Sequence, residues 1–276
     1  MKNIAAFLGD TTAIANDDID LLTKKYFNDN YGYPARPVNF TKAFRNWEIR
    51  TKWSEEYLSQ ALQYPEVMES TPGALPATMT LEQYMANPTA SLYYKTGRHL
   101  STALRHDFAS PSPFNCWYAN TGLGPPKTTL SWLYAGHPGT GSQLHRDIWW
   151  TSAWNYLISG KKLWIVYPAV YTRQIAQSLP DYRLPLENID LMSYLALRYK
   201  PMTCVQQPGE MVFVPGDCYH LVLNLEKSIS LTENFINETN YDLVKGYFRS
   251  GSSQKNYEDI EAVVAEGFNS LKLVTA

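Results

Sequence analysis

Histidine is scarce in this chain of 276 residues, and two of its five histidines stand where metal ligands are expected. His145 and Asp147 are two positions apart, and residues i and i+2 of a β-strand project from the same face. His220 follows a Pro-Gly-Asp turn and begins another expected strand. Two imidazoles and one carboxylate on one side of a metal leave positions open, as in non-haem Fe(II) sites that activate oxygen. A His-x-Asp pair alone is weak evidence, because structural histidines are commoner than ligands.

Strands are expected to position these residues. Several segments are rich in β-branched and aromatic residues, and Ser159-Gly160, Pro208-Gly209 and Pro215-Gly216-Asp217 are turn signals between them. Many short strands with such turns favour a mainly β fold of the jelly-roll type. The expected strands are Ser91–Tyr94, Leu130–Ala135, Ser152–Ile158, Lys162–Tyr167, Met211–Val214, Tyr219–Leu225 and Ser228–Phe235.

Helices are expected on both sides of this β core. Helical spacing of apolar residues and capping residues predicts helices at 16–27, 46–50, 53–58, 80–87, 190–199, 241–248 and 257–273. No internal repeat or linker divides the chain. We therefore expect one domain over residues 1–276, with an N-terminal region over about 1–128, a core over about 129–236 and C-terminal helices over about 241–273.

Composition excludes several classes of protein. Hydrophobic residues are 45% and charged residues 18%, so the chain can bury a sizeable core. The net charge of −2 disfavours a nucleic-acid binder, and no segment approaches the ~18 apolar residues of a membrane span. The three cysteines and the absence of an evident signal peptide favour a cytoplasmic protein with reduced thiols.

Longer motifs around the three candidate ligands resemble a known family. The segments 139–147, 151–168 and 207–225, with Ile229-Ser-Leu-Thr-Glu-Asn-Phe, resemble the JmjC, or cupin-like, oxygenases that depend on Fe(II) and 2-oxoglutarate. The similarity is greatest to the lysyl-hydroxylase branch, which includes the protein once called the phosphatidylserine receptor. The resemblance implies a double-stranded β-helix, and hydroxylation of a C–H bond with O2 as oxidant and succinate and CO2 as coproducts.

The resemblance also implies roles for individual residues. His145, Asp147 and His220 would bind Fe(II), and Lys162 would hold the remote carboxylate of 2-oxoglutarate. The remaining cosubstrate contacts would come from Tyr93, Asn155, Thr232 and Asn234.

Charge and strand parity agree with these roles. A buried dianion needs a fixed cation, and hydroxyl groups can complete its hydrogen bonds. Thr232 and Asn234 share one face of their strand, while Glu233 faces away. Lys161 is the better candidate for a solvated strand-edge lysine than Lys162. Tyr93 could equally be an ordinary packed tyrosine.

The sequence departs from its relatives near the metal ligands, where it has Trp149 and Trp150 after Asp147. These rings and Asp217 would suit a cationic substrate, such as lysine or arginine, free or in a peptide. The alternatives for Asp217 and the tryptophans are a turn residue and core packing. An apolar stripe at Ile260, Val263, Val264, Phe268 and Leu271 suggests a homodimer through the C-terminal helix, and packing of this helix on the protein's own barrel is the alternative.

Two classes of function remain. The first is an Fe(II)- and 2-oxoglutarate-dependent hydroxylase acting on an amino acid, a peptide or a protein side chain; the presence of Asp147 argues against a halogenase. The second is a non-catalytic cupin-like metal- or ligand-binding protein, or a cupin isomerase with another metal. Lys162 and Thr232 discriminate between them, because only a 2-oxoglutarate site needs both.

Overall fold

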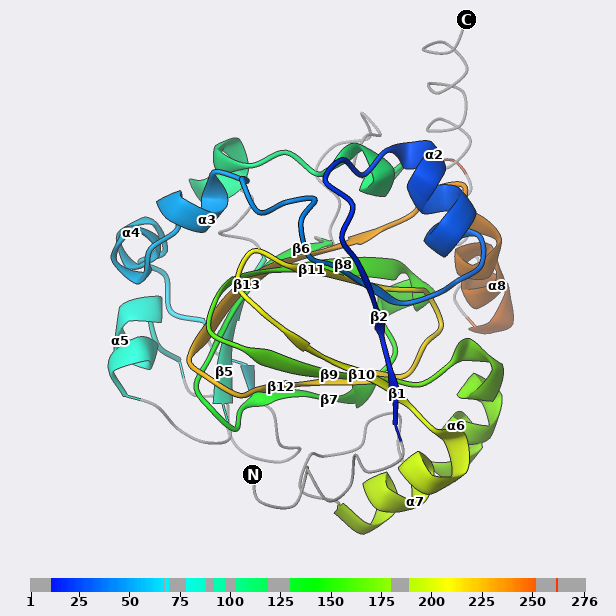
Figure 1. The fold of residues 1–276 in the computed structure, drawn as a ribbon. Coiled ribbons are helices and arrows are strands. Elements are labelled where there is room, and N and C mark those ends of the chain that lie inside the picture. Colours follow the sequence, from blue (N-terminus) through cyan, green and yellow to red (C-terminus); the bar gives the residue numbers. More distant parts are fainter. Residues whose placement is uncertain are drawn as a thin grey trace, which may run out of the picture.

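Two β-sheets face each other and form a double-stranded β-helix, or jelly roll, as the sequence predicts (Figure 1). The computed structural model describes residues 11–66, 68–69, 78–87, 92–97, 103–118, 130–179 and 189–251, and Ala262. One sheet has the strand order β1 (Thr12–Ala13), β10 (Met202–Gln206), β9 (Lys162–Val166), β12 (His220–Asn224) and β7 (Gly141–His145). The other has the order β2 (Ala15–Asp17), β3 (Val38–Phe40), β11 (Met211–Val214), β8 (Ser152–Ser159), β13 (Ser228–Phe235), β6 (Ser131–Gly136), β5 (Leu92–Thr96) and β4 (Met68–Glu69).

Alternation along the strands places apolar side chains outside the sheets and turns other side chains, several of them polar, toward the space between the sheets. In β13, Ile229, Leu231 and Phe235 belong to the hydrophobic core outside the larger sheet. Thr232 and Asn234, which have the opposite parity, line a cavity between the sheets. Because side chains alternate along a strand, each strand that lines the cavity also contributes to an outer core.

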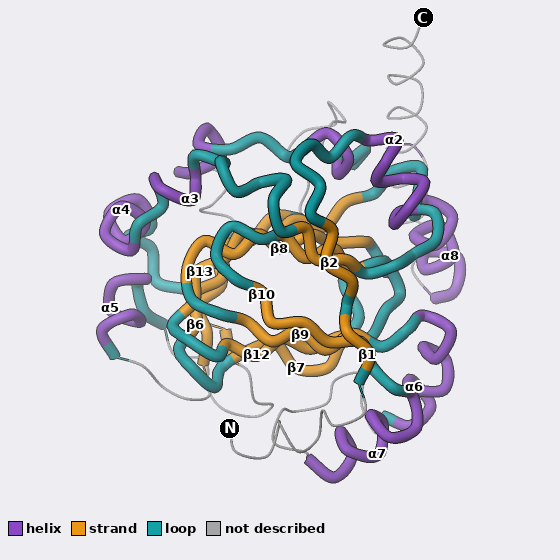
Figure 2. Tube along the Cα trace, viewed as in Figure 1, coloured by secondary structure: helices purple, strands orange, loops and turns teal. Residues whose placement is uncertain are grey.

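Helices cover the outer face of the larger sheet. Phe27, Ile49, Leu58, Tyr84 and Val244 pack from these helices into the same core as the outward side chains of β6, β8, β11 and β13. Figure 2 shows the helices arranged around the strands. Their bounds are α2 (Lys24–Phe27), α3 (Ile49–Lys52), α4 (Glu55–Ala61), α5 (Leu81–Ala86) and α8 (Tyr241–Gly251).

A second outer core lies on the smaller sheet. Ile175 of α6 (Thr172–Ser178) and Leu195 of α7 (Ile189–Tyr199) pack against Leu163, Ile165 and other outward residues of β9 and β12. With both sheets covered on the outside, the space between them is left for the site. No helix in the described part of the chain has the length and apolar character needed to cross a membrane.

The predicted strands are confirmed, with bounds that differ by a few residues, while one helix is partly wrong. The helix expected over residues 16–27 begins only at Lys24, after the N-cap Thr23, whose hydroxyl accepts from the Tyr26 backbone. Residues 15–17 form β2 instead, because they pair in parallel with β3. A short π-helix (Asn28–Gly32) follows α2.

Some of the other expected helices are observed, and one falls outside the described residues. Thr80 caps α5 through a capping box with Gln83, and α7 and α8 lie close to their expected positions. The helix expected over 257–273, with its apolar stripe, falls outside the described residues. The sequence also led to no expectation of strand β10 or helix α6, or of the short strands β1, β3 and β4.

Candidate metal centre and cosubstrate pocket

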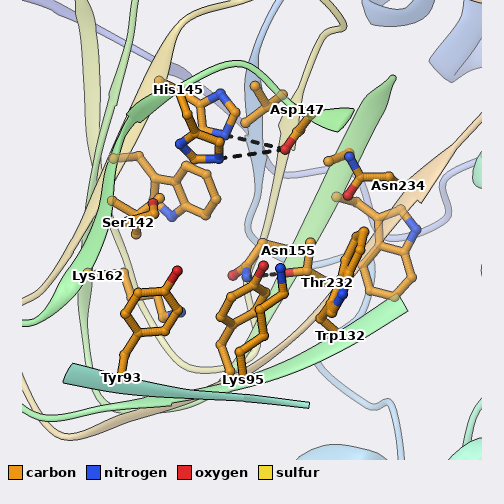
Figure 3. A pocket seen from close by; sticks show the side chains of 18 of the residues that line it. Tyr93, Lys95, Trp132, Ser142, His145, Asp147, Asn155, Lys162, Thr232 and Asn234 are labelled. Carbon is orange, nitrogen blue, oxygen red and sulfur yellow. Dashed lines mark hydrogen bonds and ion pairs between the residues drawn. The ribbon is translucent and has the colours of Figure 1, made fainter. Parts of the chain in front are cut away.

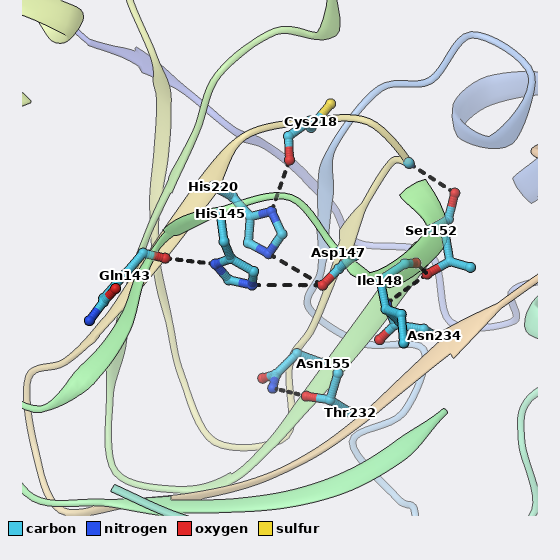
Figure 4. Close-up of polar contacts among 12 residues, drawn as sticks. Gln143, His145, Asp147, Ile148, Ser152, Asn155, Cys218, His220, Thr232 and Asn234 are labelled. Carbon is cyan, nitrogen blue, oxygen red and sulfur yellow. Dashed lines mark hydrogen bonds and ion pairs between the residues drawn. The ribbon is translucent and has the colours of Figure 1, made fainter. Parts of the chain in front are cut away.

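The three predicted metal ligands converge between the two sheets (Figure 4). His145 ends β7 and His220 begins β12, and the two residues lie opposite each other in the antiparallel pair. Nε2 of His145 lies 3.8 Å and Nε2 of His220 lies 3.9 Å from Oδ1 of Asp147. The potential ligand atoms of all three residues lie within 4.8 Å of one another. These separations suit two nitrogens and one oxygen that bind a common metal ion.

Close packing of the backbone brings β7 and β12 together at this point. A register shift lies between His220 and Val222 of β12. A Cβ added to Gly141 of β7 would lie 1.9 Å from the carbonyl oxygen of Val222. Only glycine permits this approach. The glycine and the shift therefore help to set His145 against His220.

Backbone carbonyls fix both imidazoles. Nδ1 of His145 lies 2.6 Å from the carbonyl oxygen of Gln143, and Nδ1 of His220 lies 3.0 Å from that of Cys218. A carbonyl only accepts, so each Nδ1 carries the proton and each Nε2 presents its lone pair toward Asp147. The tautomer needed for metal ligation is therefore built into the backbone.

The donor set fits Fe(II). Oδ2 of Asp147 is buried and has no hydrogen-bond partner, which is costly for a carboxylate unless a cation is present. Imidazole nitrogens and one carboxylate are the ligands of non-haem Fe(II) sites with open positions. Cys218 is not part of this set: it is a small buried residue, and burial raises the pKa of its thiol to about 12.

Two segments next to the candidate ligands, one after Asp147 and one before His220, have an unusual backbone and are joined by an ion pair. Trp149, Trp150 and Asp217 all have positive φ, at 55°, 56° and 62°. Nη1 of Arg146 lies 2.6 Å from Oδ1 of Asp217, and its guanidinium stacks over the rings of Trp150 and Tyr219. Burial raises the pKa of Asp217, and the hydrogen bond from Arg146 opposes that shift. This ion pair joins the turn before His220 to the segment that carries His145 and Asp147.

The candidate cosubstrate lysine is buried in the cavity. Nζ of Lys162 donates to Oγ of Ser230 at 2.5 Å, and the residue is 5% exposed. Burial lowers the pKa of its ammonium group to about 7. Lys161 instead lies at the surface and pairs with Glu226 at 2.6 Å. Lys162, the first residue of β9, and Lys161, which precedes the strand, thus point in opposite directions, as their parity predicts.

Hydroxyl and amide groups next to Lys162 form a connected network. Nδ2 of Asn155 donates to Oγ1 of Thr232 at 2.6 Å and to Oγ of Ser230 at 3.2 Å. Thr232 lies opposite Asn155 across the β13–β8 pair. Oδ1 of Asn155 is buried without a partner. Together with Lys162, these groups offer a charge and several hydrogen bonds to an anion.

One cavity of about 390 Å³ contains both groups (Figure 3). It is lined by the three candidate ligands and by all five predicted cosubstrate residues, namely Tyr93, Asn155, Lys162, Thr232 and Asn234. Asn234 also donates to Oγ1 of Thr151 at 2.9 Å. Glu233 faces the other way and pairs with Arg105 at 3.3 Å, as the strand parity predicts.

The three predicted substrate residues lie elsewhere. Trp149, Trp150 and Asp217 are not among the described residues that line the cavity. Trp149 packs between Tyr118 and Phe248, and Trp150 packs against Tyr247. Asp217 already has the guanidinium of Arg146 as its partner. The geometry therefore does not support the argument that these residues attract a cationic substrate.

Several lining residues were missed by the sequence reasoning. Lys95 has the same parity as Tyr93 and lines the cavity, so the alternation could have found it. Ser230, which has the same parity as Thr232 and accepts a hydrogen bond from Lys162, was also missed. Trp132 and Tyr134 of β6 also line the cavity. His137 is not among the described lining residues; it is buried, and its Nε2 lies 3.1 Å from the carbonyl oxygen of Tyr84.

The fold and the site define a cupin-like double-stranded β-helix with two histidines and a carboxylate as a facial metal triad. Comparison with known families agrees: residues 132–235 match the family described as "JmjC domain, hydroxylase". This match confirms, over residues 132–235, the resemblance seen in the sequence.

Curated relatives extend the similarity beyond this domain. The chain is 28% identical over 229 residues to the arginine-specific demethylase JMJ22 of Arabidopsis thaliana, covering 78% of this chain and 44% of the relative. It is 28% identical over 256 residues to the bifunctional arginine demethylase and lysyl-hydroxylase psr-1 of Caenorhabditis elegans, covering 84% and 63%. It is 25% identical over 272 residues to the 2-oxoglutarate and iron-dependent oxygenase JMJD4 of Danio rerio, covering 85% and 64%. The chain thus spans less than two thirds of the length of these relatives.

Proposed function

We propose that this protein is an Fe(II)- and 2-oxoglutarate-dependent oxygenase that hydroxylates a C–H bond of an amino acid, a peptide or a protein side chain. The observation that carries the proposal is one cavity that contains both the facial triad and Lys162 with its hydroxyl network. A metal site alone would fit many cupin-like proteins. A buried lysine at a distance from the metal ligands is explained by an anionic cosubstrate.

Each group has a part in this activity. The triad would hold Fe(II), which, when bound, supplies the activation of O2 that C–H hydroxylation requires. Lys162 binds the remote carboxylate of 2-oxoglutarate, and the hydroxyls of Ser230 and Thr232 lie beside it to accept and donate hydrogen bonds. Asn155 orients both hydroxyls through its amide nitrogen. Trp164 and Val222, which line the cavity, supply apolar walls that limit water around the cosubstrate.

A non-catalytic cupin-like protein or a cupin isomerase is the other class of function. Neither needs a cation at the position of Lys162. Burial lowers the pKa of this lysine to about 7, so the charged form is unfavourable there unless an anion lies next to it. Two of the relatives are named as an arginine demethylase and as an arginine demethylase and lysyl-hydroxylase. Lysine and arginine side chains are therefore among the first substrates to test.

The test is oxygen-dependent conversion of 2-oxoglutarate to succinate by the iron-loaded protein, with a panel of free amino acids and peptides. Mass spectrometry should show a gain of one oxygen in the substrate that stimulates turnover. The Lys162→Met protein should need far more 2-oxoglutarate, and the Lys161→Met protein should match the wild type. Absence of succinate from the iron-loaded protein with every member of the panel would contradict the proposal.

A further inference from the structure

The two tryptophans that follow Asp147 adopt a backbone conformation that is costly for them. Trp149 and Trp150 have φ values of 55° and 56°, in the left-handed region. A residue with a Cβ is disfavoured in this region, and such a conformation persists only where surrounding contacts hold it. Two strained residues in succession, directly after a metal ligand, therefore depend on the packing around them.

This conformation reverses the chain immediately after the ligand. The backbone N–H of Trp150 donates to the carbonyl oxygen of Asp147 at 3.1 Å, and that of Thr151 donates to the carbonyl oxygen of Ile148 at 3.0 Å. Asp147 and Ile148 are among the described residues that line the cavity, and the two tryptophans are not. Figure 4 shows the carboxylate of Asp147 directed toward the two histidine ligands. The reversal thus lets Asp147 face the metal site while the chain continues into β8.

Helix α8 and Tyr118 hold the two rings on the side away from the cavity. The ring centroids of Trp149 and Phe248 lie 5.3 Å apart, and so do those of Trp150 and Tyr247. The ring of Tyr118 meets that of Trp149 edge-on, also at 5.3 Å between centroids. Aromatic pairs at these separations are stabilising beyond the area that they bury. These contacts are the ones that can offset the backbone cost of the turn.

The same helix reaches the turn before the third ligand, His220. A Cβ added to Gly216 would lie 2.4 Å from the carbonyl oxygen of Trp150 and 2.8 Å from Cδ2 of Leu243 in α8. The backbone N–H of Gly216 also donates to Oγ of Ser152 at 3.0 Å. Only glycine permits so close an approach. Helix α8 therefore packs against both segments that lead to or from a metal ligand.

We infer that Trp149 and Trp150 are positioning residues, whose packing on α8 holds the strained turn that presents the carboxylate of Asp147 to Fe(II). The inference rests on the proposed function and concerns its metal site. Without the rings, the segment would relax and the carboxylate would leave the triad in part of the molecules. The apparent dissociation constant for Fe(II) would then rise by the reciprocal of the fraction that stays competent. Saturating Fe(II) would select the competent conformation, so the affinity for 2-oxoglutarate would be unchanged under that condition.

The test compares alanine with glycine at both tryptophan positions. Either substitution removes the ring, but only glycine adopts the left-handed conformation without steric cost. Fe(II) affinity is measured under nitrogen by competition with a chelator. Trp149→Ala and Trp150→Ala should weaken Fe(II) binding, and the matching glycine variants should bind Fe(II) about five- to thirtyfold more tightly than the alanine variants. At saturating Fe(II), all four variants should show the 2-oxoglutarate affinity of the wild type.

Two further variants separate this role from ordinary core packing. Phe248→Leu keeps an apolar side chain in the core but removes the ring that meets Trp149, so it should also weaken Fe(II) binding. It carries the test even if a tryptophan variant does not fold. Leu58→Ala, in the buried face of α4, should lower stability to urea while the folded protein keeps its Fe(II) affinity.

Three outcomes would overturn the inference: equal Fe(II) affinities in the alanine and glycine variants, wild-type Fe(II) affinity in Phe248→Leu, or a loss of 2-oxoglutarate affinity at saturating Fe(II). Binding of Fe(II) and 2-oxoglutarate by the wild-type protein, measured in the same experiments, tests the proposed function separately.

Discussion

Binding of 2-oxoglutarate should depend on pH through Lys162. Burial lowers the pKa of Lys162 to about 7, so the lysine of the cosubstrate-free protein loses its proton as the pH rises through this value. Contact with a carboxylate favours the charged form and raises the pKa again. Binding therefore takes up a proton, and the affinity for 2-oxoglutarate should fall as the pH rises above about 7.

The magnitude follows from the pKa. At pH 9, two units above the pKa of the free site, protonation of Lys162 costs about 2.7 kcal/mol, which corresponds to an affinity about a hundredfold lower than at pH well below 7. Between these limits the dissociation constant should rise about tenfold per pH unit.

The assay is an anaerobic titration of the Fe(II) protein with 2-oxoglutarate over this pH range, together with calorimetry in buffers of different ionisation enthalpy to count the protons taken up. Lys162→Arg keeps its charge throughout the range and should flatten the pH profile. Lys161→Met, at the surface beside Glu226, should keep the wild-type profile. An affinity that stays constant from pH 7 to 9, with no proton uptake, would refute the reasoning.

Four further predictions concern the ligands, the hydroxyl network, the loop and the oligomeric state. His220→Ala should lose most bound iron on dialysis and all turnover; an iron content equal to that of the wild type would remove His220 from the site. Ser230→Ala deletes the hydroxyl that accepts a hydrogen bond from Lys162 and should weaken 2-oxoglutarate binding about three- to tenfold in the same titration, and an unchanged affinity would exclude a role for this hydroxyl. Arg146→Met leaves the half-buried carboxylate of Asp217 without its cation and should lower the free energy of unfolding by about 1–3 kcal/mol, whereas the double variant with Asp217→Asn should recover part of this loss; no recovery would show that the ion pair is not the cause. The apolar stripe expected over residues 257–273 should support a homodimer in sedimentation experiments, and a monomer at micromolar concentration would reject this interpretation.

Strand parity agreed with the positions of several cavity residues that the sequence predicted. The alternation in β9 and β13 placed Lys162, Thr232 and Asn234 inside and Lys161 and Glu233 outside, and the structure agrees at each position. Parity works here because both sheets are covered by helices, so each strand has one face toward a core and one toward the cavity. The same rule applied one step further would have found Ser230 and Lys95.

Proximity in sequence was a poor guide where the backbone turns sharply. Trp149, Trp150 and Asp217 lie close to metal ligands along the chain, but all three adopt positive φ. This conformation directs the tryptophans toward Tyr118, Tyr247 and Phe248 and brings Asp217 to Arg146. Such a backbone is rare for residues other than glycine, so no simple pattern predicts it.

Long-range pairing overrode local preference at the N-terminal end. The apolar spacing over residues 16–27 predicts a helix, but residues 15–17 add to the larger sheet beside β3. Hydrogen bonds from the hydroxyls of Tyr26 and Tyr31 to Asp17 hold this segment against the helix that follows. A parallel partner more than twenty positions away leaves no signal in a local window.

The central claim is that one cavity binds Fe(II) through the triad and 2-oxoglutarate through Lys162. The most direct measurement is the addition of 2-oxoglutarate to the Fe(II) protein under nitrogen, followed by the weak visible charge-transfer band that forms when the cosubstrate binds to iron. The account predicts a saturable band with one equivalent each of iron and 2-oxoglutarate, lost in Asp147→Ala and shifted to much higher cosubstrate concentration in Lys162→Met. An iron-loaded protein that gives no band at any concentration of 2-oxoglutarate would contradict it.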